Sequence, residues 1–70
     1  MIILFAPAGK FPQREAEVTE QLNAKIKDSF CVRCKSEKWV KFQFDSDGVP
    51  AISDACCSDV CAEVTKARGL

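Results

Sequence analysis

Five cysteines in a chain of 70 residues constrain its fold more than any other feature. Cys31 and Cys34 form a Cys-x-x-Cys pair, and Cys56, Cys57 and Cys61 form a second cluster nearer the C-terminus. A chain this short buries only about 60% of its unfolded surface, so an apolar core alone leaves it marginally stable. The cysteines therefore indicate a cross-link, through a metal or through disulfides, that adds to the core.

The composition predicts a single domain, residues 1–70, that is globular and soluble. Hydrophobic residues make up 47% and charged residues 29%, which is ordinary for such proteins. The apolar N-terminal segment is broken by Pro7 and lacks a basic leader, so we expect neither a membrane span nor a secretion signal. The expected location is cytoplasmic, where thiols or metal thiolates prevail over disulfides. An odd number of cysteines fits four ligands and one spare.

The charges are balanced overall and uneven along the chain. Ten basic and ten acidic residues give no net charge, which argues against generic binding of polyanions. Residues 25–41 carry six basic and two acidic side chains, whereas residues 42–63 carry five acidic ones and no basic one. Thiolates and a cation between the two segments would suit this asymmetry, and ordinary solvated surface charge explains it equally well.

The pattern of apolar residues predicts an α+β fold. Val18, Leu22 and Ile26 recur at four-residue spacing, which indicates a helix from about Pro12 to Asp28. Strict alternation from Trp39 to Phe44 predicts a strand with Val40, Phe42 and Phe44 on its core side. The full expected order is a strand at 2–6, this helix, a Cys-x-x-Cys loop at 29–38, a hairpin at 39–52, and a second helix from a cap at Ser53 or Asp54 to about Arg68.

The second helix leaves two interpretations of its cysteines open. Cys57, Val60, Cys61 and Val64 fall on one apolar stripe, so these cysteines can be plain core residues. Cys31 and Cys34 lie in a polar loop, where packing gives no reason for thiols. A zinc ion held tetrahedrally by four thiolates explains both clusters together.

The predicted metal ligands are Cys31, Cys34, Cys57 and Cys61. Residues 57 and 61 are four apart and share one face of the expected helix, so their sulfurs can converge on one ion. Cys56 precedes that face and is the spare, although an exchange of Cys56 with Cys57 stays open.

A Cys-x-x-Cys knuckle, a hairpin and a helix with two further cysteines resemble the treble-clef type of zinc finger. The resemblance covers about the last forty residues and implies that Cys31 and Cys34 form the knuckle while Cys57 and Cys61 are the helical ligands. Two features depart from that pattern: Lys35 stands where a glycine usually follows the second cysteine, and the helical pair is spaced by four residues instead of three.

A four-thiolate zinc site is closed to substrate, and the chain contains no histidine, so we expect a non-catalytic role. The expected function is a protein-interaction module, with a protein favoured over nucleic acid as partner. Its predicted surface consists of exposed basic residues around an aromatic side chain: Arg33, Lys35, Lys38, Trp39 and Lys41. In the simpler alternative, Trp39 packs internally and the lysines are merely solvated.

The competing function is thiol redox chemistry or metal handling by the Cys-x-x-Cys pair. Arg33 and Lys35 would lower the pKa of a neighbouring thiol, as a redox pair requires. An iron–sulfur cluster held by the same cysteines is a further variant.

Overall fold

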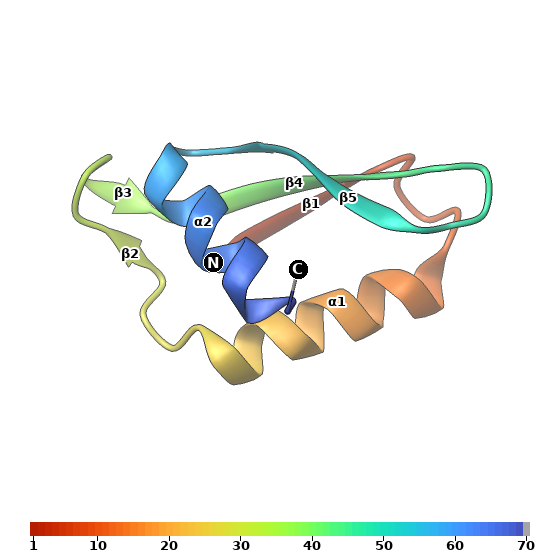
Figure 1. The fold of residues 1–70 in the computed structure, drawn as a ribbon, viewed down its shortest axis with the longest axis horizontal. Coiled ribbons are helices and arrows are strands. Elements are labelled where there is room, and N and C mark those ends of the chain that lie inside the picture. Colours follow the sequence, from red (N-terminus) through yellow and green to blue (C-terminus); the bar gives the residue numbers. More distant parts are fainter. Residues whose placement is uncertain (70) are drawn as a thin grey trace.

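The computed structural model describes residues 1–69 and has the predicted α+β architecture (Figure 1). The elements follow in the order β1 (Ile2–Ala6), α1 (Pro12–Lys25), β2 (Phe30–Cys31), β3 (Ser36–Glu37), β4 (Trp39–Phe44), β5 (Pro50–Ala55) and α2 (Ser58–Ala67). Within the described residues, no helix has both the length and the apolar character needed to cross a membrane.

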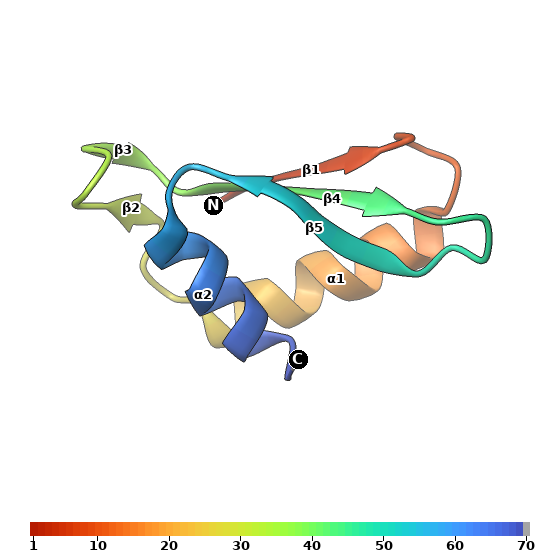
Figure 2. The same cartoon turned by 45° about the horizontal axis from the view of Figure 1, so that its top comes forward.

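The main sheet has three strands in the order β1-β4-β5. β1 runs parallel to β4, with α1 as the crossover, and β4 pairs with β5 as an antiparallel hairpin. Both helices lie on the same face of this sheet (Figure 2). The fold therefore has two layers, and the helices leave the second face of the sheet uncovered.

The core lies between the sheet and the two helices. The alternation along β4 is confirmed, because Val40 and Phe42 are buried while Lys41 between them is exposed. These side chains meet the buried faces of the helices, formed by Val18 and Leu22 of α1 and by Val60, Val64 and Ala67 of α2. Burying a side chain of this size is worth about 1.5–3 kcal/mol, so β4 supplies much of the apolar stabilisation.

Aromatic side chains fill the end of the sheet beside the β4–β5 turn. Phe44 lies between Phe5 and Phe11, with ring centroids 5.6 and 5.1 Å away. Gly48 in the turn has a φ of +79°, and a Cβ atom there would come within 2.9 Å of the Phe11 ring. A glycine is thus needed both for the backbone conformation and for the close approach of Phe11.

Two predicted helix boundaries are wrong, each for a local reason. α1 ends at Lys25 instead of Asp28, because Ile26 adopts an extended backbone. α2 begins at Ser58, not after a cap at Ser53 or Asp54. The residues up to Ala55 extend β5 and pair with β4, so strand pairing replaces the helix turn that the capping residues predicted.

Candidate metal centre

The Cys-x-x-Cys segment forms a tight two-stranded knuckle, where the sequence predicted an irregular loop. β2 and β3 pair so that Cys31 lies opposite Ser36. The base of the knuckle is closed by the Lys38 N–H, which donates to the Ser29 carbonyl at 2.7 Å. Lys35 takes a φ of +55°, in the left-handed region that glycine favours. The residue that follows the second cysteine of the pair therefore adopts a glycine-like conformation.

The second pair of cysteines lies in the bend between β5 and α2. The Cys56 N–H donates to the Trp39 carbonyl at 3.1 Å, which anchors the bend to the start of β4. Cys57 is the N-cap of α2, and its carbonyl accepts the first helical hydrogen bond, from the Cys61 N–H at 3.1 Å. Both cysteines thus stand at the N-terminal end of α2, the positive end of the helix dipole.

Four cysteine sulfurs gather between the knuckle and the start of α2. The Sγ atoms of Cys31, Cys34, Cys56 and Cys57 all lie within 4.8 Å of one another. The Cys31 and Cys57 sulfurs are 3.7 Å apart. A tetrahedral zinc ion with Zn–S bonds of about 2.3 Å places its ligand sulfurs about 3.8 Å apart, so the Cys31–Cys57 distance matches that of two ligands of one ion.

The cluster shifts the pKa values of two of its cysteines in opposite directions, down for Cys31 and up for Cys34. The backbone N–H of Cys34 is the main cause that lowers the pKa of Cys31 from 9.0 to about 7, and the Cys57 thiol contributes. Desolvation raises the pKa of Cys34, as do the neighbouring Cys31, Cys56 and Cys57 groups. Four close thiols cannot all ionise together in the absence of a positive charge, and a divalent metal ion supplies that charge.

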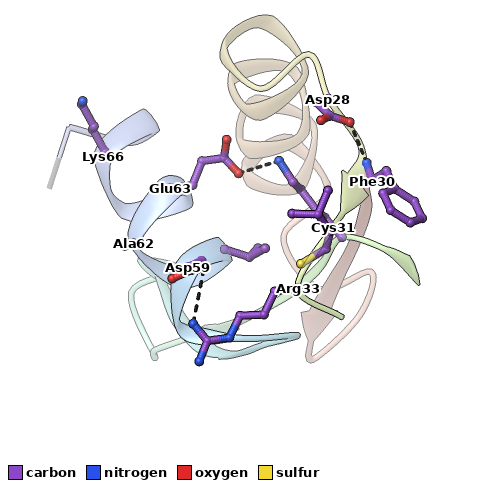
Figure 3. Close-up of a pocket in the computed structure, with 11 residues that line it drawn as sticks. Asp28, Phe30, Cys31, Arg33, Asp59, Ala62, Glu63 and Lys66 are labelled. Atoms are coloured by element: carbon purple, nitrogen blue, oxygen red, sulfur yellow. Dashed lines mark hydrogen bonds and ion pairs between the residues drawn. The ribbon is translucent and has the colours of Figure 1, made fainter. Parts of the chain in front are cut away.

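Two ion pairs connect the knuckle to α2 across an open groove of about 590 Å³ (Figure 3). The Arg33 guanidinium lies 3.4 Å from the Asp59 carboxylate, and both side chains are largely exposed. The Lys38 ammonium donates to Glu63 at 2.8 Å, with only 11% of the lysine side chain accessible. Hydrogen bonding to Glu63 is the main cause that raises the pKa of Lys38. The deeper pair therefore fixes the base of the knuckle to α2.

The gathered cysteines differ from the predicted ligand set in one member. Cys31, Cys34 and Cys57 come together as expected, and the fourth sulfur is that of Cys56. Cys61 lies one turn into α2, half-buried and outside this group. The late start of α2 explains the difference, because it leaves Cys56 and Cys57 together in the bend.

The predicted binding surface is divided between the two sides of the molecule. By the alternation along β4, Lys41 and the half-buried Trp39 lie on the uncovered face of the sheet. Arg33 and Lys38 are instead paired with α2, and Lys38 is buried. The sequence analysis did not predict that Asp59 and Glu63 pair with these two residues. The acidic residues of the segment 42–63 were the feature that could have indicated such pairs.

Comparisons of the chain with protein-family models, with curated proteins and with solved structures found no match, so its function must be inferred from this geometry.

Proposed function

We propose that this protein is a small non-catalytic domain held together by a structural zinc ion and used to bind another protein. The observation that carries the proposal is the gathering of the Cys31, Cys34, Cys56 and Cys57 sulfurs within 4.8 Å. Four sulfur ligands in a tetrahedral arrangement are typical of zinc or of an iron–sulfur cluster. Four thiolates also fill the coordination sphere of zinc, which suits a structural role and leaves no position for substrate.

Metal analysis of protein purified without chelator tests the site directly. We expect about one equivalent of zinc and a colourless protein, since thiolate-ligated zinc sites hold one ion. Purified protein with no bound metal would overturn the proposal, and a coloured protein with iron would replace zinc by a cluster.

Two matched variants test which cysteines are the ligands. Cys56→Ser should lower zinc affinity strongly, because it removes one of the four gathered sulfurs. Cys61→Ser makes the same chemical change one helical turn away and should keep full zinc occupancy. The reverse result would restore the ligand set predicted from the sequence and contradict the role of Cys56.

A protein partner fits the exposed surface better than a nucleic acid does. Two of the basic side chains near the site are neutralised, since Arg33 pairs with Asp59 and Lys38 with Glu63. The uncovered face of the sheet instead presents apolar groups: Ile2 and Leu4 are each 46% exposed, and Ile2 is in register with Trp39. Apolar and aromatic groups of this kind are enriched in protein interfaces.

Fluorescence of Trp39, the single tryptophan, tests the choice of partner. Adding single-stranded oligonucleotide should leave its emission unchanged, because the chain has no net charge to attract phosphates. A salt-dependent shift of the emission would favour nucleic acid and contradict the proposal.

The alternative function, thiol redox or metal handling, is favoured by one observation. The Cys31 and Cys57 sulfurs are 3.7 Å apart, and the pKa of Cys31 is lowered to about 7, which favours its thiolate form. We propose a cytoplasmic location, where thiols stay reduced unless they take part in redox chemistry. The thiols of a zinc site react with a thiol reagent only after the metal is removed, whereas those of a redox pair react freely. Thiol titration before and after chelation therefore separates the two functions.

A further inference from the structure

The two edges of the main sheet are protected to very different degrees. β5 carries Pro50, which has no N–H to offer, and Asp54, and its pairing with β4 contains a register shift between Lys41 and Phe42. Prolines, charges and bulges of this kind are the features that prevent edge strands from pairing with another chain. β1 has none of them: it is Ile-Ile-Leu-Phe-Ala, and its register with β4 is regular.

The outer edge of β1 leaves backbone groups available for pairing. The Ile2 N–H donates to the Lys38 carbonyl at 2.8 Å, so the backbone of Ile2 faces β4. Because backbone direction alternates along a strand, the N–H and C=O groups of Ile3 and Phe5 face away from β4. β1 is the end strand of the sheet that residues 1–69 form, and Figure 2 shows no element beyond it.

We propose that β1 pairs antiparallel with β1 of a second copy of this chain, about a two-fold axis at Leu4. In this register Ile3 lies opposite Phe5 of the second copy, and the two residues exchange both backbone hydrogen bonds. The same exchange occurs on the other side of the axis. All the outward backbone groups of Ile3 and Phe5 are then satisfied, and the two sheets join into one of six strands.

The side chains of β1 suit a second copy as the occupant. The strand is uncharged, so two copies can approach without the repulsion that a charged edge would cause. Leu4 is 46% exposed on the uncovered face and would lie directly opposite Leu4 of the second copy, where side chains are closest. Lys41, the residue of β4 in register with Leu4, is itself in register with the oppositely charged Asp54 of β5. An interface that matches itself in this way is the type that closes a two-fold dimer.

Sedimentation analysis over a range of protein concentrations, on zinc-loaded protein, tests the proposal. We expect a reversible monomer–dimer equilibrium, since one strand pair gives a small interface. Leu4→Lys should raise the dissociation constant at least about tenfold, by placing two ammonium groups at the axis. Val49→Lys, which also replaces an exposed apolar residue but at the β4–β5 turn, should leave it unchanged.

A mixture of variants identifies the register. Leu4→Lys and Leu4→Glu should each be monomeric alone, and mixing them should restore a dimer because opposite charges then meet at the axis. Hydrogen exchange gives a second readout: the Ile3 and Phe5 amides should become protected as concentration rises.

Three outcomes would overturn this dimer: a monomer at every concentration, equal effects of Leu4→Lys and Val49→Lys, or Ile3 and Phe5 amides that exchange equally fast in monomer and dimer. Zinc content and circular dichroism are measured on the same samples, so unfolding of a variant is recognised. The inference rests on the edge strand and not on the metal, and loss of the dimer with zinc retained leaves the metal centre intact.

Discussion

The two ends of β4 are stabilised by different means. At its C-terminal end, Phe44 packs between Phe5 and Phe11 in an apolar cluster. Beyond its N-terminal end, the knuckle exposes its large apolar residues, with Phe30 at 49% and Val32 at 79% accessible. The molecule is elongated, 34 Å against 20 Å in the other two directions, so the two ends are well separated.

This difference shows how so short a chain divides its stabilising interactions. Among the described residues, only nine hydrophobic side chains are buried, and Cys31 is the one that the knuckle contributes. Apolar burial therefore stabilises the centre of the molecule and the end beside the β4–β5 turn, where Phe44 packs. The knuckle end instead has four close sulfurs and the two ion pairs to α2, and the metal ion that we propose there would stabilise it.

The largest expected effect is the loss of the metal. A strong chelator should unfold the knuckle end and, with it, the cooperative structure of the whole chain. Structural zinc contributes on the order of 10–16 kcal/mol of apparent binding free energy, which exceeds what a core of this size supplies. Circular dichroism and Trp39 fluorescence with and without chelator measure this. An unchanged spectrum after verified metal removal would show that apolar burial alone suffices.

The next effect compares one residue type at the two ends. Phe42→Ala removes a side chain that is 1% exposed and should lower the free energy of unfolding by about 3–5 kcal/mol. Phe30→Ala, at the knuckle, should change it by less than about 0.5 kcal/mol, because the side chain is half exposed. Urea denaturation of the zinc-loaded proteins provides both values. Similar losses in the two variants would mean that Phe30 stabilises the knuckle by packing.

A pair of glycines sharpens the account of the aromatic end. Gly9 and Gly48 have nearly the same φ, +78° and +79°, but only at Gly48 would an added Cβ atom lie 2.9 Å from the Phe11 ring. Replacing either by alanine should cost about 1 kcal/mol for the left-handed backbone. Gly48→Ala should cost about 1–2 kcal/mol more, because Phe11 must move. Thermal unfolding compares the two variants, and equal losses would show that Phe11 yields freely.

The ion pair at Lys38 gives a smaller effect that depends on which partner is removed. Glu63→Ala leaves a buried ammonium without its acceptor and should cost about 1–2 kcal/mol. Lys38→Met keeps the buried stem and leaves only a partly exposed carboxylate, so it should cost less than about 1 kcal/mol. Unfolding free energies of the two variants decide this order.

The same pair predicts a pH dependence. The pKa of Lys38 is raised in the folded state, so its contribution is fully present below the unfolded pKa and is lost as pH rises through the folded one. The loss should therefore appear only above about pH 10.5, near the ordinary value, and should be absent in Lys38→Met. Denaturation at several alkaline pH values compares wild type with this variant.

The smallest expected effect is a gain. Lys35→Gly relieves a left-handed φ of +55° at the knuckle and should stabilise the zinc-loaded protein by about 1 kcal/mol or less, since glycine also costs more chain entropy. A loss of stability measured by thermal unfolding would show that the lysine side chain itself supports the knuckle.

Alternation and spacing along the sequence predicted most of the fold. β1 and β4 have the predicted bounds, Ile2–Ala6 and Trp39–Phe44, because each is defined by its own apolar residues. The end of β5 was not predictable in this way. Asp54 and Ala55 are extended because they pair with Lys41 and Val40, a contact that no local pattern encodes.

That one boundary also decided the candidate site. With a helix starting near residue 54, Cys57 and Cys61 share a face, and the sequence predicts them as ligands. With α2 starting at Ser58, adjacent Cys56 and Cys57 lie in an extended bend, and the sulfur of Cys56 reaches the cluster. The buried position of Lys38 was missed for a related reason, because Glu63 reaches it from a distant element.

The placement of the cysteines has a consequence for the order in which the chain assembles. Cys34 and Cys56 stand on either side of the β4–β5 hairpin, so a metal ion that joins them closes a loop containing only local pairings. β1 must instead pair with β4 from Ile2 to Trp39, across α1 and the knuckle, and such distant contacts form slowly. A growing polypeptide exposes its N-terminal part first. During synthesis, β1 would therefore remain unpaired until the β4–β5 hairpin has emerged, and the metal ion that we propose would bind the hairpin before β1 pairs with it.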